Sequence, residues 1–183
     1  KIMIKIGING FGRIGRLVLR ALLENYKDKI QVVAINDLGS IEANAHLVKY
    51  DSTHGTLPYD VETSKDGFKI LNQDIKVFAE RDPVNLPWGK IGVDVVLECT
   101  GLFLDKTSAE KHIKAGAKKV IISAPAKEVD FTVVQGVNSS ELKKEHNVIS
   151  NGSCTTNCLA PVAMVLEKNF GIEYGYMTTI HSY

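Results

Sequence analysis

A cysteine that directly follows a helix-capping residue is the most reactive group that the sequence offers. Ser153 is a typical N-cap, so Cys154 would stand in the first turn of a helix expected over Thr155–Phe170. There the helix dipole and the unpaired backbone N–H groups favour a thiolate, and the same groups can stabilise an oxyanion on a carbonyl that the thiolate attacks. Cys154 is therefore the candidate nucleophile for covalent chemistry on a carbonyl compound.

The other thiols and the histidines have weaker claims. Cys158 lies one helical turn further on and Cys99 ends an apolar strand, so both are expected to be packed and inert. A thiol nucleophile needs a nearby base, and His181 could fold back against Cys154 to serve as one. A histidine near a strand end is more often structural or solvated. The remaining histidines are expected on polar or helical surfaces: His46, His54, His112 and His146.

A glycine-rich turn near the N-terminus predicts a nucleotide site. Residues 10–15 read Gly-Phe-Gly-Arg-Ile-Gly, which matches G-x-G-x-x-G. Gly10 permits the tight turn, Gly12 lets the backbone approach a pyrophosphate, and Gly15 lets the helix and the strand pack closely. The pattern by itself often has only a steric role. Here it follows an apolar strand and opens an amphipathic helix, whose N-terminus can bind phosphates.

An acidic residue at the end of the second strand indicates which nucleotide is bound. Asp37 lies 22 positions after Gly15. A carboxylate there accepts hydrogen bonds from a ribose 2′-OH and would repel a 2′-phosphate. The pair Asn36-Asp37 could instead form only a turn, but its combination with the glycine pattern favours the nucleotide. The N-terminal part of the chain is therefore predicted to bind NAD.

Alternating strands and helices must position these residues. The strand Met3–Asn9, a helix from Arg13 with Arg16, Arg20 and Glu24 on its polar face, and the strand Ile30–Asn36 form a βαβ unit. The alternation continues and predicts an α/β fold with a Rossmann-type, doubly wound, mostly parallel sheet. The other expected elements are a helix over Ser40–Tyr50 capped by Ser40, a hairpin of Phe68–Leu71 and Ile75–Phe78, the strands Val93–Cys99, Lys119–Ser123, Val133–Val137 and Val148–Ser150, and helices over Thr107–Ala115 and Ser139–Glu145.

The last segment is expected to open a second domain. The helix Thr155–Phe170 carries an apolar stripe that must be buried, and a strand expected over Tyr174–Tyr183 has no partner within the chain. The predicted organisation is an NAD-binding domain over residues 1–152 and the start of a catalytic domain over residues 153–183. The remainder of that second domain is expected to be missing from this chain.

Composition argues against several classes of protein. Lys plus Arg is 22 and Asp plus Glu is 21, a net charge of +1, so neither nucleic acid nor an anionic membrane is an expected partner. No apolar stretch approaches the 18 or more residues of a membrane span. The three cysteines form no C-x-x-C or Cys/His cluster, so neither a disulfide framework nor a metal site is expected. A cytoplasmic protein with reduced thiols is predicted.

Several motifs along the whole chain resemble those of the glyceraldehyde-3-phosphate dehydrogenase family, and the resemblance covers about the first half of the family's usual length. They are Gly-Ile-Asn-Gly-Phe-Gly-Arg-Ile-Gly-Arg at 7–16, Asp-Ser-Thr-His-Gly at 51–55, Glu-Cys-Thr-Gly at 98–101, Ser-Ala-Pro-Ala-Lys at 123–127 and Ser-Cys-Thr-Thr-Asn-Cys at 153–158. The resemblance implies NAD as cofactor, lined by Phe11, Arg13, Ile14, Asp37, Arg81, Thr100 and Ser123. To these we add Gly10, Gly12 and Gly101 as cofactor-binding residues.

The resemblance also implies a reaction. Cys154 would attack the aldehyde of glyceraldehyde 3-phosphate, and His181 would accept the hydroxyl proton as hydride leaves for the nicotinamide. Inorganic phosphate would then convert the thioester to 1,3-bisphosphoglycerate, with Ser153 and Thr155 contacting the phosphate groups. Gly152 departs from the family, which more often has alanine there.

The same resemblance implies a homotetramer for the full-length protein. Two alternatives stay open: an erythrose-4-phosphate dehydrogenase, and a non-catalytic NAD-binding fragment. Residues 1–183 alone are expected to be inactive.

Overall fold

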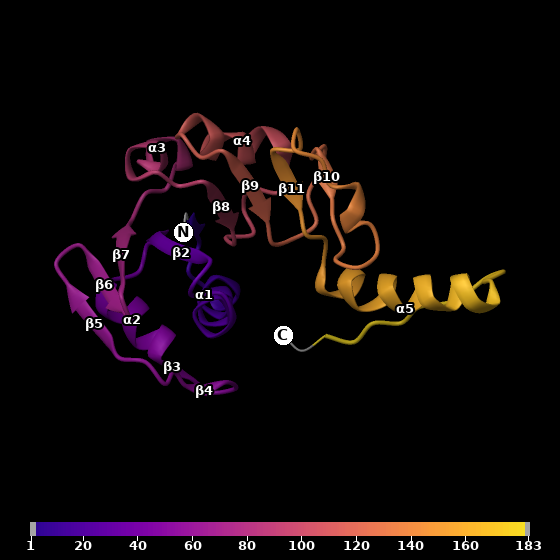
Figure 1. The fold of residues 1–183 in the computed structure, drawn as a ribbon, viewed down its shortest axis with the longest axis horizontal. Helices are drawn as coiled ribbons and strands as arrows, with labels where there is room; N and C mark the ends of the chain where they lie inside the picture. The colour runs from indigo at the N-terminus through magenta and orange to yellow at the C-terminus, as the bar shows by residue number, and fades with distance from the viewer. Residues whose placement is uncertain (1–2, 182–183) are drawn as a thin grey trace.

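The computed structural model describes residues 3–181, which fold around one large sheet (Figure 1). Its strands are Ile4–Asn9 (β1), Ile30–Asn36 (β2), Val61–Ser64 (β5), Gly67–Ile70 (β6), Gln73–Phe78 (β7), Val95–Glu98 (β8), Lys119–Ile122 (β9), Phe131–Thr132 (β10) and Val148–Ser150 (β11). Within the described residues their order is β10-β11-β9-β8-β1-β2-β7-β6-β5. The strands from β10 to β7 are parallel, and β6 and β5 continue the sheet in antiparallel fashion. The predicted fold class is confirmed.

Helices cover both faces of this sheet, as a doubly wound fold requires (Figure 1). The helices are Arg13–Asn25 (α1), Ile41–Lys49 (α2), Trp88–Ile91 (α3), Lys106–Lys114 (α4) and Cys154–Phe170 (α5), with short 3₁₀ turns at Pro83–Asn85 (η1) and Ser139–Glu141 (η2). α1 and α2 pack on one face, and α3 and α4 pack on the other. A small hairpin of Tyr50–Asp51 (β3) and Gly55–Thr56 (β4) follows α2.

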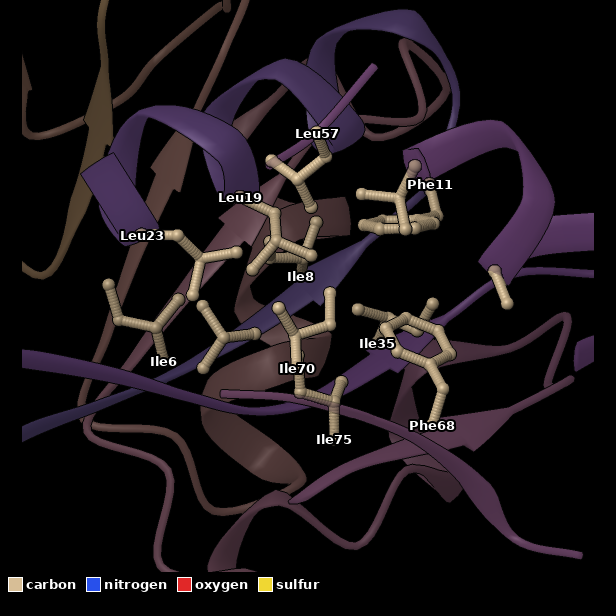
Figure 2. Packing of buried hydrophobic residues seen from close by; sticks show 13 residues of the cluster. Ile6, Ile8, Phe11, Leu19, Leu23, Ile35, Leu57, Phe68, Ile70 and Ile75 are labelled. Carbon is tan, nitrogen blue, oxygen red and sulfur yellow. The ribbon is translucent and has the colours of Figure 1, made fainter. Parts of the chain in front are cut away.

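The larger core lies between the sheet and the pair α1 and α2 (Figure 2). Ile8 of β1, Leu19 of α1, Ile35 of β2 and Ile70 of β6 are completely buried there. Apolar side chains on alternate strand positions face these helices, because successive residues of a strand point to opposite faces. The core therefore fixes the position of the turn between β1 and α1, which is the glycine-rich segment.

The expectation that Arg20 lies on an exposed polar face of α1 is wrong. Arg20 is 6% exposed, and its guanidinium donates to the carbonyl oxygens of Val48 (3.0 Å), Lys49 (3.0 Å) and Gly55 (2.8 Å). The last carbonyl groups of a helix have no hydrogen-bond partner within the helix. Arg20 donates to these carbonyls at the end of α2 and thereby connects α2 to α1. Ile14, in the first turn of α1, is 48% exposed.

The expectations of a strand over Val133–Val137 and a helix over Ser139–Glu145 are also wrong. The strand is β10, which ends before Val133, and the helix is reduced to η2. Asn138 explains the difference, because its Oδ1 accepts from the Val134 N–H (2.8 Å) and its Nδ2 donates to the Thr132 carbonyl (3.0 Å). Such side-chain bonds to the backbone compete with both strand and helix.

The C-terminal segment differs from its prediction as well. Residues 174–181 contain no strand, and Ser182 and Tyr183, the end of the expected strand, lie outside the described residues. The segment runs back beside α5 instead of joining the sheet (Figure 1). None of the residues of α5 is buried, and Phe170 at its end is 83% exposed. No described helix is both long and apolar enough to cross a membrane.

Candidate functional site

A pocket of about 380 Å³ opens at the carboxyl ends of β1, β2 and β8. From β1 the chain proceeds to β2 on one side, whereas β8 flanks β1 on the other. Ligands of doubly wound folds bind at this switch point in strand order. The lining residues are Asn9, Gly10, Gly12, Asn36, Asp37, Leu38, Glu80, Arg81, Cys99, Thr100, Leu102 and Phe103.

The pocket brings together half of the residues predicted to bind the cofactor. Gly10, Gly12, Asp37, Arg81 and Thr100 line it. The others lie outside this lining: Phe11, Arg13, Ile14, Gly101 and Ser123. Sequence reasoning missed Asn9 and Asn36, although each is a polar residue at the end of an apolar strand and therefore lies at the edge where ligands bind.

The glycine turn has the geometry that a pyrophosphate requires. Gly10 has φ +87°, a conformation that favours glycine. A Cβ on Gly15 would lie 2.2 Å from the Gly10 carbonyl oxygen, so α1 can pack this closely on the turn only with glycine there. A Cβ on Gly12 would meet no atom within 4 Å, because this residue faces the open pocket. The turn thus leaves room for phosphates at the N-terminus of α1.

The carboxylate of Asp37 is held beside this turn. One oxygen accepts from the Phe11 N–H and the other from the Gly39 N–H, each at 2.9 Å. The Phe11 side chain points into the core, where its ring lies 6.1 Å from that of Phe68, so Phe11 can face the pocket only through its backbone. An ionised carboxylate only accepts hydrogen bonds, and Asp37 therefore fits a ribose hydroxyl and not a phosphate.

Arg13 is engaged by the hairpin after α2. Its guanidinium forms an ion pair with Asp51 (2.5 Å) and contacts the His54 ring at 3.3 Å. The backbone N–H groups of His54 and Thr53, together with Arg13, hold the pKa of Asp51 well below its usual range. These contacts connect the first turn of α1 to the β3–β4 hairpin.

Replacing Asp37 with alanine should reduce the preference for NAD over NADP. The unmodified protein should bind NAD more tightly than NADP, because the 2′-phosphate would meet a carboxylate. Asp37→Ala should weaken NAD binding about tenfold, equivalent to one charge-assisted hydrogen bond, and should leave NADP binding the same or stronger. Fluorescence titration with each nucleotide measures both effects. Equal dissociation constants for the two nucleotides in the unmodified protein would contradict this prediction.

The second candidate centre lies at the start of α5. Cys154 is the first residue of α5 and is exposed, and the Ser153 hydroxyl accepts from the Thr156 N–H at 2.9 Å, which confirms the predicted cap. Cys158 is exposed as well, so the expectation that it is packed is wrong, because the described chain buries none of the residues of α5. Cys99 behaves as expected: burial raises its pKa to about 11, although a hydrogen bond from Ser123 opposes part of the shift.

His181 contacts Thr155, the residue that follows Cys154. Its Nε2 is 3.3 Å from the Thr155 hydroxyl and 2.7 Å from the Thr179 hydroxyl. In the described part of the chain no hydrogen bond joins His181 to Cys154. The structure thus brings the predicted base to the neighbouring residue of the predicted nucleophile, at the N-terminus of α5.

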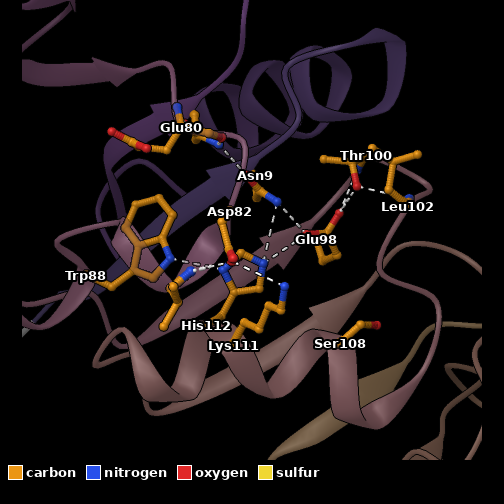
Figure 3. A network of polar contacts seen from close by, with 12 residues as sticks. Asn9, Glu80, Asp82, Trp88, Glu98, Thr100, Leu102, Ser108, Lys111 and His112 are labelled. Carbon is orange, nitrogen blue, oxygen red and sulfur yellow. Dashed lines mark hydrogen bonds and ion pairs between the residues drawn. The ribbon is translucent and has the colours of Figure 1, made fainter.

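Another histidine was placed incorrectly by its sequence context. His112, expected on a helix surface, is completely buried and contacts Glu98 and Trp88 (Figure 3). One sequence signal could have indicated this buried contact: Glu98 is a polar residue at the end of the buried strand β8. Among residues 3–181, no group of three or more His, Cys, Asp or Glu side chains is arranged to hold a metal ion.

Comparison with known proteins identifies relatives along the whole chain. Residues 4–106 match the family described as glyceraldehyde 3-phosphate dehydrogenase, NAD binding domain, and residues 153–183 match the C-terminal domain of that enzyme. The chain is 56% identical to a glyceraldehyde-3-phosphate dehydrogenase of Pseudomonas aeruginosa, over 98% of this chain and 54% of the relative. It is 58% identical to one of Geobacillus stearothermophilus, over 98% and 53%, respectively. The chain therefore spans about half the length of the curated relatives it matches.

Proposed function

Because the chain belongs to the glyceraldehyde-3-phosphate dehydrogenase family and carries its NAD-binding domain, we propose that the full-length protein is the phosphorylating enzyme. It would convert glyceraldehyde 3-phosphate, NAD and inorganic phosphate to 1,3-bisphosphoglycerate and NADH, a reaction of sugar-phosphate metabolism. The observation that carries this proposal is the pairing of a dinucleotide pocket with an exposed cysteine at a capped helix N-terminus. The first suits NAD, and the second suits covalent chemistry on an aldehyde.

The residues around Cys154 have defined tasks in this proposal. The thiolate attacks the aldehyde carbon, and the free N–H groups of the first turn of α5 stabilise the oxyanion that forms. NAD, held by the pocket at the ends of β1, β2 and β8, would supply the hydride acceptor for the thiohemiacetal. His181 accepts the hydroxyl proton in the same step, which leaves a thioester on Cys154. Inorganic phosphate then attacks the thioester carbonyl, and the thiolate leaves.

Two residues beside the thiol would bind the phosphate groups. Thr155 presents its hydroxyl to His181, and the Ser153 hydroxyl lies 2.8 Å from that of Thr156. For catalysis, His181 has to come within hydrogen-bond reach of the hydroxyl that forms on the substrate. Catalytic hydrogen bonds often reach their working geometry only when substrate is bound, so the present contact with Thr155 is compatible with this role.

An assay of the purified full-length protein tests the proposal. Absorbance of NADH should rise with glyceraldehyde 3-phosphate and depend on added phosphate. Erythrose 4-phosphate should be oxidised at lower kcat/KM, and the opposite order would favour the alternative of an erythrose-4-phosphate dehydrogenase. NAD binding without oxidation of either aldehyde would favour a non-catalytic NAD-binding protein.

The three thiols should differ in reactivity towards iodoacetamide. Cys154 should be alkylated first, because the dipole and the free N–H groups of α5 stabilise a thiolate there. Cys158 is also exposed but lies within the helix, where these groups are already bonded, and Cys99 is slow because burial raises its pKa to about 11. Peptide mapping after limited labelling at neutral pH measures the order. Equal labelling of Cys154 and Cys158 would contradict it.

We place the boundary between the two domains after residue 152, which is supported by the beginning of α5 at a capped N-terminus. A protein of residues 1–183 alone should associate and show no turnover. α5 exposes Val162 and Phe170, and the returning segment exposes Tyr176. In residues 1–183 alone, few contacts would hold His181 in place. A displacement of a catalytic group by about 1 Å can cost roughly 100-fold in rate.

Sedimentation measures the association of residues 1–183, and the NADH assay measures their turnover. Turnover near that of the full-length protein would contradict the prediction. For the full-length protein we propose a homotetramer, which the same sedimentation measurement tests.

A further inference from the structure

A continuous set of buried hydrogen bonds crosses the carboxyl ends of the strands beneath the NAD pocket (Figure 3). The Asn36 amide of β2 donates to the Glu80 carbonyl (2.8 Å) and to Asn9 Oδ1 of β1 (2.7 Å). The Asn9 amide then donates to Glu98 Oε2 of β8 at 2.6 Å. Asn9, Asn36 and Glu98 are at most 5% exposed. The floor of the pocket is therefore polar, and it ends on a carboxylate.

Glu98 receives donors at both of its oxygens. Oε1 accepts from the backbone N–H (2.8 Å) and the hydroxyl of Thr100, and Oε2 accepts from Asn9 and from His112 Nε2 (2.9 Å). A carboxylate can accept at both oxygens, whereas a carboxylic acid would have to place its own proton among these donors. The contacts therefore identify Glu98 as ionised.

The tautomer of His112 follows from Trp88. The indole N–H can only donate, and it lies 3.0 Å from His112 Nδ1, so Nδ1 must be the acceptor. The proton of the imidazole is then on Nε2, where it is donated to Glu98. In this state His112 is neutral, and the hydrogen-bond partners that the described residues provide for Glu98 include neither lysine nor arginine. The negative charge of Glu98 is buried without a cationic partner.

The position of this charge matches one end of a bound dinucleotide. With the adenosine ribose at Asp37 and the pyrophosphate at the turn that begins with Gly10, the second nucleoside crosses β1 towards β8. Thr100 and Asn9, which both donate to Glu98, line the pocket on that side. The second nucleoside carries the nicotinamide, whose ring is positively charged in NAD⁺ and uncharged in NADH.

We propose that Glu98 is a positioning and specificity residue that makes this pocket prefer NAD⁺ to NADH through its buried negative charge. The inference rests on the proposed site for NAD and concerns only the difference between the two redox states. A buried charge acts more strongly than an exposed one, because the surrounding protein screens it less than water does. We expect it to contribute about tenfold to the ratio of the two dissociation constants.

The test compares variants of the full-length protein in which the charge is removed or kept. Glu98→Gln alone would direct an amide N–H at His112 Nε2–H. The double variant Trp88→Phe/Glu98→Gln removes the conflict with His112, because His112 can then carry its proton on Nδ1 and accept at Nε2, and only the Asn9 amide still faces the new amide. Trp88→Phe alone is the matched control, since it keeps the charge. Fluorescence titrations with NAD⁺ and with NADH give both dissociation constants for each variant.

Loss of the charge should raise the dissociation constant for NAD⁺ about tenfold more than that for NADH, relative to the Trp88→Phe control. For a two-electron couple this corresponds to a shift of about 30 mV in the potential of the bound cofactor. A purely structural role would weaken both complexes equally, and that result would overturn the inference. If the unmodified protein binds neither form, the proposed NAD site itself fails.

A second variant keeps the proposal testable if the double variant does not fold. Glu98→Asp retains the charge but shortens the side chain, so it should weaken both complexes while leaving their ratio within about twofold of the unmodified value. If Glu98→Asp clearly reduces the preference for NAD⁺ over NADH, the side-chain contacts of Glu98, and not its charge, determine that preference.

Discussion

Cys154→Ser should lower turnover of the full-length protein by about 10⁴-fold or more, as the loss of a covalent nucleophile does in other enzymes. A serine hydroxyl at the start of α5 is not ionised near neutral pH, so it cannot replace a thiolate. NAD binding should stay within about twofold of normal, because Cys154 is not among the residues that line the pocket. Steady-state kinetics and nucleotide titration measure the two effects.

Cys158→Ser is the matched control for this prediction. Cys158 is exposed on the same helix, one turn after Cys154, and the substitution is chemically identical. Turnover with Cys158→Ser should stay within about threefold of normal, since surface substitutions have small effects. A large loss in this variant together with retained activity in Cys154→Ser would exchange the two assignments.

Gly15→Ala and Gly12→Ala should have different effects on stability and on NAD binding. A methyl group on Gly15 would lie 2.2 Å from the Gly10 carbonyl oxygen, which is backbone and cannot move aside without shifting α1. This variant should therefore lose about 3 kcal/mol of stability and most of its NAD binding. Urea unfolding gives the stability, and nucleotide titration gives the affinity.

A methyl group on Gly12 has open space around it, and Gly12 has φ −71°, which suits alanine. Gly12→Ala should therefore keep the unfolding midpoint of the unmodified protein. It should nevertheless weaken NAD binding about tenfold or more, because the methyl group would occupy the place of the pyrophosphate. A stable Gly15→Ala protein with normal NAD binding would contradict the roles assigned to the two glycines.

The sequence by itself determined the α/β class and the order of most elements, and it predicted the two candidate centres. Hydrophobic periodicity identifies β1, α1 and β2 because each buries one regular set of apolar side chains. The glycine pattern, Asp37 and the cap at Ser153 depend on neighbours close in the chain, so local rules are sufficient for them. The prediction failed where a single polar side chain formed bonds to distant backbone, as Arg20 does with the end of α2.

Only the tertiary structure decided which residues meet across the sheet. Asn9, Asn36 and Glu98 end three different strands, and nothing in their local sequence shows that they share one buried hydrogen-bond network. His112 lies on a polar helix, yet it is buried because α4 packs against β9 and directs His112 inward to Glu98 and Trp88. Contacts of this kind depend on the register and packing of elements far apart in the chain, for which a local pattern carries no information.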